Sequence, residues 1–217
     1  MVVEEHMGNH PDRETVFGNA IVEHLEVIHG VKEQLELLEE IARVMAAALH
    51  RGNQILWCGN GGSAGDSQHL AAEVVGRFRR ERRGLPSIAL TTDTSILTSV
   101  ANDYGFEAVF SRQVEAMARP GDVLVGISTS GNSRNVVAAL ETARVHGVTT
   151  VAFTGEGGGR LSALADHLFA VASRDTARIQ EAHIFAGHML CDWLELDWIA
   201  SQAHETRDGE AREAGVR

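Results

Sequence analysis

The residues whose spacing most directly suggests chemistry lie on one predicted helix. His69, Glu73 and Arg77 are each four residues apart, so they line one face of that helix. Leu70 and Val74 flank them and would bury much of the helix, which makes water a poor partner for the three polar groups. A histidine and a glutamate one turn apart can bind a divalent metal, and a partly buried glutamate can act as a general base. A solvated polar face is the alternative that the spacing leaves open.

A second group of candidates lies at the start of the last predicted helix, which spans about residues 177–198. This segment offers Gln180, Glu181, His183 and His188 to the same side of the domain. Gln180 and His188 are eight residues apart, a rise of about 12 Å on a helix, so reaching one small ion from one chain is marginal. If both act at one site, subunits have to share it. The alternative is that the histidines are packing or surface residues.

The helix of His69 is preceded by a glycine-rich loop that follows the first predicted strand. The loop contains Asn60, Gly61, Gly62 and Ser63. Its glycines let backbone N–H groups approach a ligand, and the next helix directs its positive end to the same point, so an anion is the expected guest. The segment Gly59–Ala64 also matches the dinucleotide pattern G-x-G-x-x-A. Against a dinucleotide, the first acid after the second strand, Asp93, comes about thirty residues past the glycines instead of about twenty.

Hydroxyl groups gather in a second loop, which follows the third predicted strand. They belong to Ser128, Thr129, Ser130 and Ser133. Together with the N-terminus of the next helix, these hydroxyls can satisfy three phosphate oxygens without a lysine. An ordinary helix cap by Ser130 or Asn132 is the alternative for this loop alone. Two such loops at neighbouring strand ends favour a phosphorylated sugar, because a dinucleotide domain has no need of the second.

These loops and helices belong to an alternating pattern of short apolar runs and helical stretches. Five runs have the length of strands, at residues 54–58, 86–90, 122–128, 148–154 and 166–171. Nearly continuous apolar strands separated by helices are typical of a parallel sheet that is covered on both faces. The sequence therefore predicts a three-layer αβα, doubly wound domain with a five-stranded parallel sheet. Ligands of such a domain bind at the carboxyl ends of the strands.

Two helices are expected before the sheet. Apolar residues between 22 and 28 suggest the first, and apolar residues at steps of three and four from 31 to 49 predict a longer second helix. Gly30 is expected to separate the two. The whole chain is predicted to form a single domain, 1–217, in which the charged segments of about 1–12 and 202–217 are flexible tails.

Composition and charge narrow the class of protein. The 217 residues are 44% hydrophobic and 23% charged, which is ordinary for a globular domain. The net charge of −11 argues against broad contact with nucleic acid or with an anionic membrane surface. Five arginines between Arg77 and Arg83 are interpreted as a solvated helix end and loop, with the exception of Arg77 itself.

Further features of the sequence concern its compartment. No run approaches the ~20 apolar residues of a membrane span, and the acidic, polar start is unlike a signal peptide. Cys58 and Cys191 are expected to be buried thiols in a reducing compartment. A cytoplasmic protein is therefore predicted.

Several motifs together resemble one known family. They are CGNGGSAGDSQHLAAEVVGRF, ANDYGF, GDVLVGISTSGNSRNV, TGEGGG and RIQEAHI followed by His188. In this combination the chain, over about residues 15–200, resembles the sedoheptulose 7-phosphate (phosphoheptose) isomerases of the sugar isomerase (SIS) class. The resemblance implies a flavodoxin-like SIS fold and a homotetramer with active sites between subunits. It also implies conversion of the phosphorylated seven-carbon ketose to D-glycero-D-manno-heptose 7-phosphate, an early step toward the heptoses of bacterial surface glycans such as lipopolysaccharide.

The same resemblance implies roles for individual residues. The acid/base pair falls on Glu73 and His188. One zinc ion per subunit, found in some members, would be held by His69, Glu73, Gln180 and His188. The contacts to the substrate fall on Asn60, Gly61, Gly62, Ser63, Arg77, Asp103, Ser128, Thr129, Ser130, Ser133 and Gln180.

Departures from the family motifs, and other members of the SIS class, leave alternatives for one contact and for the function. Ala177 stands where some members have an acidic residue, and Asp175 or Thr176 is a possible substitute. A relative of the class is a non-catalytic scaffold that binds the replication initiator DnaA, and such a scaffold is the alternative function. That relative lacks counterparts of Glu73 and His188, whereas this chain has both. Other members of the class act on arabinose 5-phosphate or glucosamine 6-phosphate, and the loops alone do not measure the length of the sugar.

Overall fold

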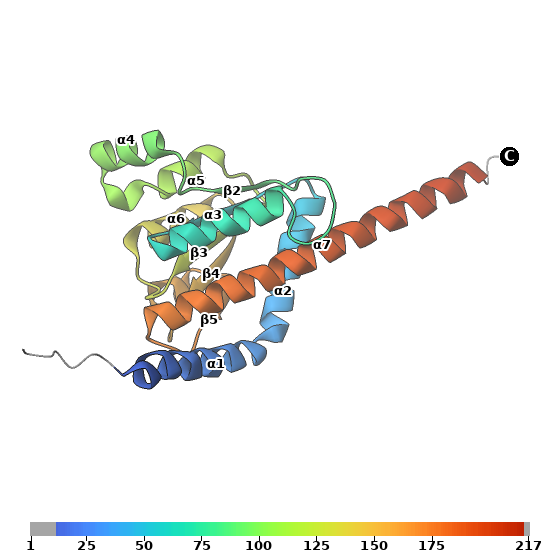
Figure 1. The fold of residues 1–217 in the computed structure, drawn as a ribbon. Helices are drawn as coiled ribbons and strands as arrows, with labels where there is room; N and C mark the ends of the chain where they lie inside the picture. Colours follow the sequence, from blue (N-terminus) through green and yellow to red (C-terminus); the bar gives the residue numbers. More distant parts are fainter. Residues whose placement is uncertain (1–11, 215–217) are drawn as a thin grey trace, which may run out of the picture.

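The computed structural model describes residues 12–214, and the side chains of residues 12–203 (Figure 1). The strands are β1 (Ile55–Gly59), β2 (Ser87–Ala89), β3 (Val123–Ser128), β4 (Thr149–Thr154) and β5 (His167–Ala170). The α-helices are α1 (Asn19–Lys32), α2 (Leu35–His50), α3 (Gly62–Val75), α4 (Thr94–Tyr104), α5 (Ser111–Met117), α6 (Arg134–Val145) and α7 (Thr176–Ala214). Short helical turns are η1 (Glu14–Gly18), η2 (Phe106–Ala108) and η3 (Gly159–Ala163).

The five strands form one parallel sheet in the order β2-β1-β3-β4-β5. This is the flavodoxin-like order, and the direction in which strands are added reverses between β1 and β3. Helices cover both faces of the sheet, so the predicted three-layer, doubly wound domain is confirmed (Figure 1). A ligand crevice is expected at the carboxyl ends of β1 and β3, where the connections diverge to opposite faces.

The hydrophobic core is divided by the sheet into two halves, because successive side chains of a strand point to opposite faces. Trp57 packs in the half that is covered by α2, α3 and α7, and Cys58, the next residue, packs in the half covered by α5 and α6. Cys58 and Cys191 are both buried and unpaired, which confirms the expectation of buried thiols. Because both faces of the sheet are buried, the central strands need apolar residues on both sides.

The two N-terminal helices are present, but the expected boundary at Gly30 is wrong. Gly30 lies inside α1, and the helix ends at Lys32. A single glycine weakens a helix by about 1 kcal/mol without removing a hydrogen bond, so it does not by itself end one. The corner falls instead at residues 33–34, where the Gln34 side chain donates a hydrogen bond of 3.0 Å to the carbonyl of Ala170 at the end of β5. A contact with the sheet therefore sets this boundary.

The last helix is longer than expected. α7 continues past Trp198 to Ala214, through most of the segment predicted to be a flexible tail. Residues 1–11 and 215–217 lie outside the described residues, and the flexibility of the two tails stays a prediction. Within residues 12–214, no helix combines the length and the apolar composition that a membrane crossing requires.

Candidate active site

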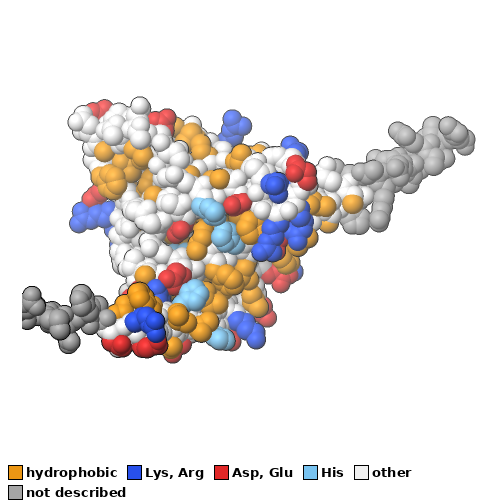
Figure 2. Space-filling view, in the orientation of Figure 1, with side chains coloured by type: hydrophobic (Ala, Val, Ile, Leu, Met, Phe, Trp, Pro, Cys, Tyr) orange, Lys and Arg blue, Asp and Glu red, His pale blue; other side chains and the backbone are white. Residues whose placement is uncertain are grey.

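The candidate site is built where α3 and α7 lie side by side. The Nε2 atoms of His69 on α3 and His188 on α7 are 2.8 Å apart, and Oε1 of Glu73 lies 3.4 Å from Nε2 of His69. The helices approach closely here because Gly187 faces Leu70, whose side chain would clash with any Cβ at position 187. Figure 2 shows histidine side chains at the surface over this contact, beside acidic and basic groups. Glu73 and His188 thus border the same imidazole within one chain.

The imidazole of His188 is held in a partly apolar environment. The ring of Phe78 stacks on it, with the ring centres 5.2 Å apart and the planes inclined by 19°. Burial lowers the pKa of His188, the nearby His69 and Arg79 lower it further, and Glu73 opposes them. A neutral imidazole can accept a proton from one oxygen of a substrate and donate one to another.

Gln180 lies on α7, eight residues or about two helical turns before His188. Its side-chain amide packs against Gly62, where any Cβ would clash with it, so this glycine lets Gln180 reach the start of α3. The interactions of the described residues join His69 with Glu73 and with His188, but do not join Gln180 with any of the three. In the same part of the chain, no group of three or more His, Cys, Asp or Glu side chains is arranged to hold a metal ion.

The glycine-rich loop after β1 leads directly into α3. Gly61 has a φ of 57°, a left-handed conformation that favours glycine, and it precedes the helix without a side-chain cap. The Ser63 backbone N–H donates to the carbonyl of Asn60 at 3.1 Å, and Ser63 is buried. The positive end of the α3 dipole therefore points at the crevice. The first turn of α3 has no acidic side chain that would occupy the place of a bound anion.

The hydroxyl-rich loop after β3 is held by its own side chains. The Oγ atoms of Ser128 and Ser133 are 2.9 Å apart, and Oγ of Ser130 accepts a hydrogen bond from the N–H of Asn132. Ser133 occupies the position before α6 and makes no side-chain cap. The alternative of a helix cap by Ser130 or Asn132 is therefore not observed. Thr129 lies in the same loop, and its carbonyl accepts the N–H of Gly155.

A pair of amides joins the two loops, and the sequence reasoning missed it. Asn60 and Asn135 exchange two hydrogen bonds, of 2.9 and 2.8 Å. Asn135 is buried and its Oδ1 also accepts the N–H of Val136 at the start of α6. The loops after β1 and β3 are thus locked to each other. The only signal in the sequence was an asparagine two residues after Ser133.

Two of the predicted substrate contacts are not brought to this site within the chain. Asp103 lies exposed near the end of α4, where it accepts a hydrogen bond from Asn102. Arg77 follows the end of α3, so it does not continue the helical face of His69 and Glu73, and it pairs with Glu81 at 3.7 Å. In the described part of the chain, no hydrogen bond or ion pair ties either residue to the two loops or to the histidine pair.

The arginine run is not a solvated loop throughout, and that interpretation is wrong for Arg82. The side chain of Arg82 is 3% exposed and lies 3.6 Å from a carboxylate oxygen of Glu195, which is fully buried on α7. Sequence reasoning missed both residues, because a buried pair between a loop and a distant helix leaves no local pattern. Arg79 and Arg80 pair with Asp192, also on α7.

Two other acids are explained by helix capping. Asp93, weighed as a ribose-binding acid, accepts the N–H of Ile96 at the start of α4. Asp175 accepts the N–H groups of Ala177 and Arg178 at the start of α7. The capping role of Asp93 removes the acid on which a dinucleotide site would depend.

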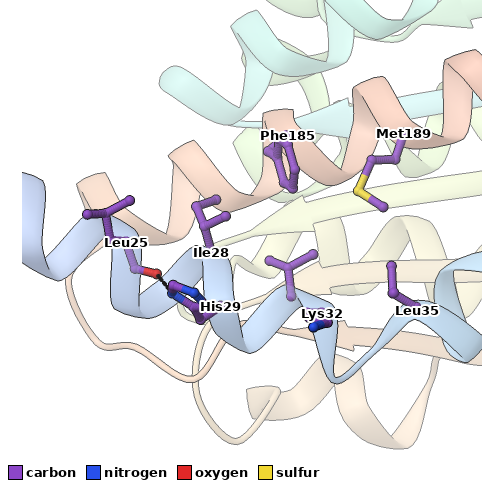
Figure 3. Close-up of a pocket in the computed structure, with 8 residues that line it drawn as sticks. Leu25, Ile28, His29, Lys32, Leu35, Phe185 and Met189 are labelled. Atoms are coloured by element: carbon purple, nitrogen blue, oxygen red, sulfur yellow. Dashed lines mark hydrogen bonds between the residues drawn. The ribbon is translucent and has the colours of Figure 1, made fainter.

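A hollow of about 320 Å³ lies apart from this chemistry (Figure 3). It is formed between α1 and α7, and its lining is almost entirely apolar, with Leu25 and Ile28 from α1 facing Phe185 and Met189 from α7. A phosphorylated sugar needs polar partners, so this hollow does not suit it.

Comparisons with known proteins identify the family of the chain. The family model described as SIS domain matches residues 17–155. The chain is 58% identical over 156 residues to the phosphoheptose isomerase of Aquifex aeolicus, a match that covers 72% of this chain and 82% of that one. It is 59% identical over 160 residues to the phosphoheptose isomerase of Nitratidesulfovibrio vulgaris, covering 74% and 77%. The solved phosphoheptose isomerase of Neisseria gonorrhoeae superposes with a TM-score of 0.80 at 42% identity, covering 85% of this chain and 99% of that one.

Proposed function

The chain belongs to the phosphoheptose isomerases of the SIS family, and on that premise we propose how its residues perform the isomerisation. The reaction converts the ketose sedoheptulose 7-phosphate to the aldose D-glycero-D-manno-heptose 7-phosphate. A carbonyl group moves from C2 to C1, which requires removal of a proton bound to C1, an enediol, and return of a proton to C2. The enzyme therefore needs one group for the carbon-bound proton and one for the oxygens.

We assign the carbon-bound proton to the carboxylate of Glu73. This side chain is partly buried beside His69, so water competes with the substrate less than at an open surface. His188, a neutral imidazole, carries a proton between O1 and O2 of the enediol. The observation that carries this assignment is the convergence of α3 and α7 at His69, which places both groups at one spot.

The two loops hold the phosphate end of the sugar. The uncapped N-termini of α3 and α6 and the hydroxyls of Ser128 and Ser133 lie at the carboxyl ends of neighbouring strands, where a phosphate meets N–H and O–H donors without a lysine. Thr129 and Ser130 extend the same donor set, and Asn60 and Ser63 line the other loop. Binding the phosphate fixes C1 and C2 at a set distance along the sugar.

The test is incubation of the purified protein with sedoheptulose 7-phosphate in D₂O, followed by NMR of the product. The expected result is an aldose with deuterium at C2, since the enediol takes its proton from a group that exchanges with solvent. No aldose would overturn the proposal and leave the DnaA-binding scaffold, which the comparisons do not support, as the function to be tested. An aldose that acquires no deuterium even after many reversible turnovers would overturn the enediol, because a base that exchanges with solvent would by then have introduced it.

We propose that zinc binds where the imidazoles of His69 and His188 meet Glu73. Two imidazoles and a carboxylate are a donor set that zinc favours, but as described they are not arranged as a ready-made metal site, so the facing Nε2 atoms would have to turn toward a common ion. Gln180 would complete the set. When bound, the ion would polarise the carbonyl of the substrate. Elemental analysis after dialysis against zinc should find one ion per chain, and the His69→Gln variant should bind less. Equal binding by that variant would overturn this ligand set.

We also propose a homotetramer in which neighbouring subunits complete each site. Large apolar side chains lie exposed along the N-terminal helical segment, among them Phe17, Ile21 and Leu25. A second copy covering this face would bury them. In this proposal Asp103 and Arg77, which stand away from the site within one chain, contribute to the site of a neighbour. Sedimentation at several concentrations should give four times the chain mass, and a monomer would overturn the proposal.

The compartment we propose is the cytoplasm. Cys58 and Cys191 are buried and free, which suits a reducing environment, and burial raises the pKa of each thiol to about 12. Fractionation of the native cells should recover the protein with the soluble cytoplasmic enzymes. Recovery from an oxidising compartment would overturn this.

A further inference from the structure

Glu195 is a fully buried carboxylate that no step of the proposed reaction uses. It lies on α7, two helical turns after His188. Its Oε1 accepts the backbone N–H of Phe78 at 2.6 Å, and its Oε2 accepts those of Arg79 and Arg80, each at 2.9 Å. Burial raises the pKa of Glu195, but these three hydrogen bonds and Arg82 outweigh burial and lower it overall. The carboxylate thus holds the irregular segment that follows α3.

Arg82 is the buried partner of this carboxylate. Its Nε lies 3.6 Å from Oε1 of Glu195 and makes no hydrogen bond within the described residues. The terminal nitrogens donate to the carbonyl of Glu73 at 2.8 Å and to that of Gly76 at 3.0 Å. These carbonyls belong to the C-terminal end of α3, where a helix leaves its last carbonyls without partners. Arg82 therefore caps α3 at the residue proposed as the base.

The two contacts reach both members of the proposed acid/base pair. Through Arg82, the carboxylate of Glu195 is tied to the backbone of Glu73. Through the N–H of Phe78, it holds the ring that stacks on His188. We propose that Glu195 and Arg82 are positioning residues, which together fix Glu73 and the Phe78 ring that orients His188. This inference rests on the proposed function for the identity of the pair, and its geometry is independent of the substrate.

The chemistry of a buried ion pair supports a positioning role. A buried carboxylate and guanidinium stabilise a fold little, because desolvation offsets their attraction, and an apolar pair of similar volume is often as stable. Such a pair specifies geometry instead, through directed hydrogen bonds. A displacement of about 1 Å in a catalytic group can cost about a hundredfold in rate.

The test compares three variants by NMR of the His188 ring protons, by kcat and KM, and by melting temperature. Glu195→Gln replaces one oxygen by an amide nitrogen that cannot accept, so at least one backbone hydrogen bond is lost. Phe78→Leu keeps the backbone N–H and removes only the stacked ring. Phe78→Tyr retains the ring. The matched control is Asp197→Asn, which removes another carboxylate of α7, one that pairs with His50 away from His188.

Glu195→Gln and Phe78→Leu should both shift the His188 ring-proton resonances, because the ring current of Phe78 is displaced or removed. We expect kcat to fall about 10- to 100-fold while KM changes by less than about threefold. Phe78→Tyr should keep the parent kcat and KM, and Asp197→Asn should match the parent in the His188 resonances, kcat and KM. If Glu195→Gln does not fold, Phe78→Leu decides the stacking step.

The inference is overturned if folded Glu195→Gln leaves the His188 resonances unchanged, or if Phe78→Leu retains the parent kcat. A parent protein that forms no aldose would overturn the proposed function instead. In that case the NMR comparison still decides the positioning claim, because it needs no substrate.

Discussion

Nε2 of His69 lies 2.8 Å from Nε2 of His188, although 119 positions separate the two residues in the chain. At this distance one ring donates its N–H and the other accepts it, so the pair holds a single hydrogen between the two atoms. The contact unites α3, which begins at the glycine-rich loop after β1, with α7, the last helix of the domain.

Replacing the proposed base should abolish most of the activity and leave the fold intact. Glu73→Gln keeps the size of the side chain but removes the group that accepts the proton from C1. Turnover should fall at least about a hundredfold, as measured by the rate of aldose formation, with an unchanged melting temperature. Glu81→Gln is the matched control, because that side chain is 90% exposed beside Arg77. Near-parent turnover in Glu73→Gln would remove this residue from the role of base.

Removing a hydroxyl from the loop after β3 should weaken binding more than turnover. Ser133→Ala takes away the hydrogen-bond partner of Ser128 and, in the proposed function, one donor to the phosphate. Hydrogen bonds to a charged group contribute about 1.5–3 kcal/mol, so KM should rise about 10- to 100-fold with little change in kcat. Ser99→Ala is the control, because that exposed hydroxyl bonds only to its own helix. An unchanged KM in Ser133→Ala would place the phosphate elsewhere.

The same loop should be intolerant of a side chain at Gly131. This glycine has a φ of 64°, and an added Cβ would clash with the carbonyl of Gly158. Gly131→Ala should destabilise the fold by at least about 2 kcal/mol, or roughly 4–8 °C in melting temperature. Gly30→Ala should do the opposite by about 0.5–1 kcal/mol, since it lies inside α1 with no atom within 4 Å of the added Cβ. Equal melting of Gly131→Ala and the parent would contradict the loop packing.

Stability should fall in mild acid because of His183. This ring is buried against Phe153 and Phe169, and burial lowers its pKa to about 4, against 6.5 when it is free. Between pH 4 and 6.5, His183 therefore binds a proton in the unfolded chain but not in the folded chain. As the pH falls from about 6.5 to about 4, the free energy of unfolding drops by roughly 3 kcal/mol.

Urea unfolding at pH 4.5 and 7 measures this difference for the parent and for His183→Gln, which has no proton to gain. The pH dependence should be weaker in His183→Gln. The exposed His29, replaced by Gln, serves as the control and should retain the parent behaviour. The same pH dependence in all three proteins would show that His183 is not responsible.

The sequence by itself determined the structural elements that depend only on residues close together in the chain. Strand runs of continuous apolar residues indicated a covered parallel sheet, because burial on both faces leaves no room for alternation. Glycines and hydroxyls at two strand ends indicated an anion site, since backbone approach and helix polarity depend only on neighbouring residues. The pairing of His69 with Glu73 followed from the period of a helix.

Only the tertiary structure decided which distant groups meet. The approach of His188 to His69 depends on Gly187 packing against Leu70, a contact between helices that no local pattern records. The break at residues 33–34 depends on Gln34 reaching β5, and the capture of Arg82 depends on Glu195 being enclosed by packing. Helix period and strand burial act over a few residues, whereas these contacts depend on how finished helices dock on the sheet. The arrangement proposed for catalysis is therefore a property of packing, built from helices and loops that the sequence had already specified.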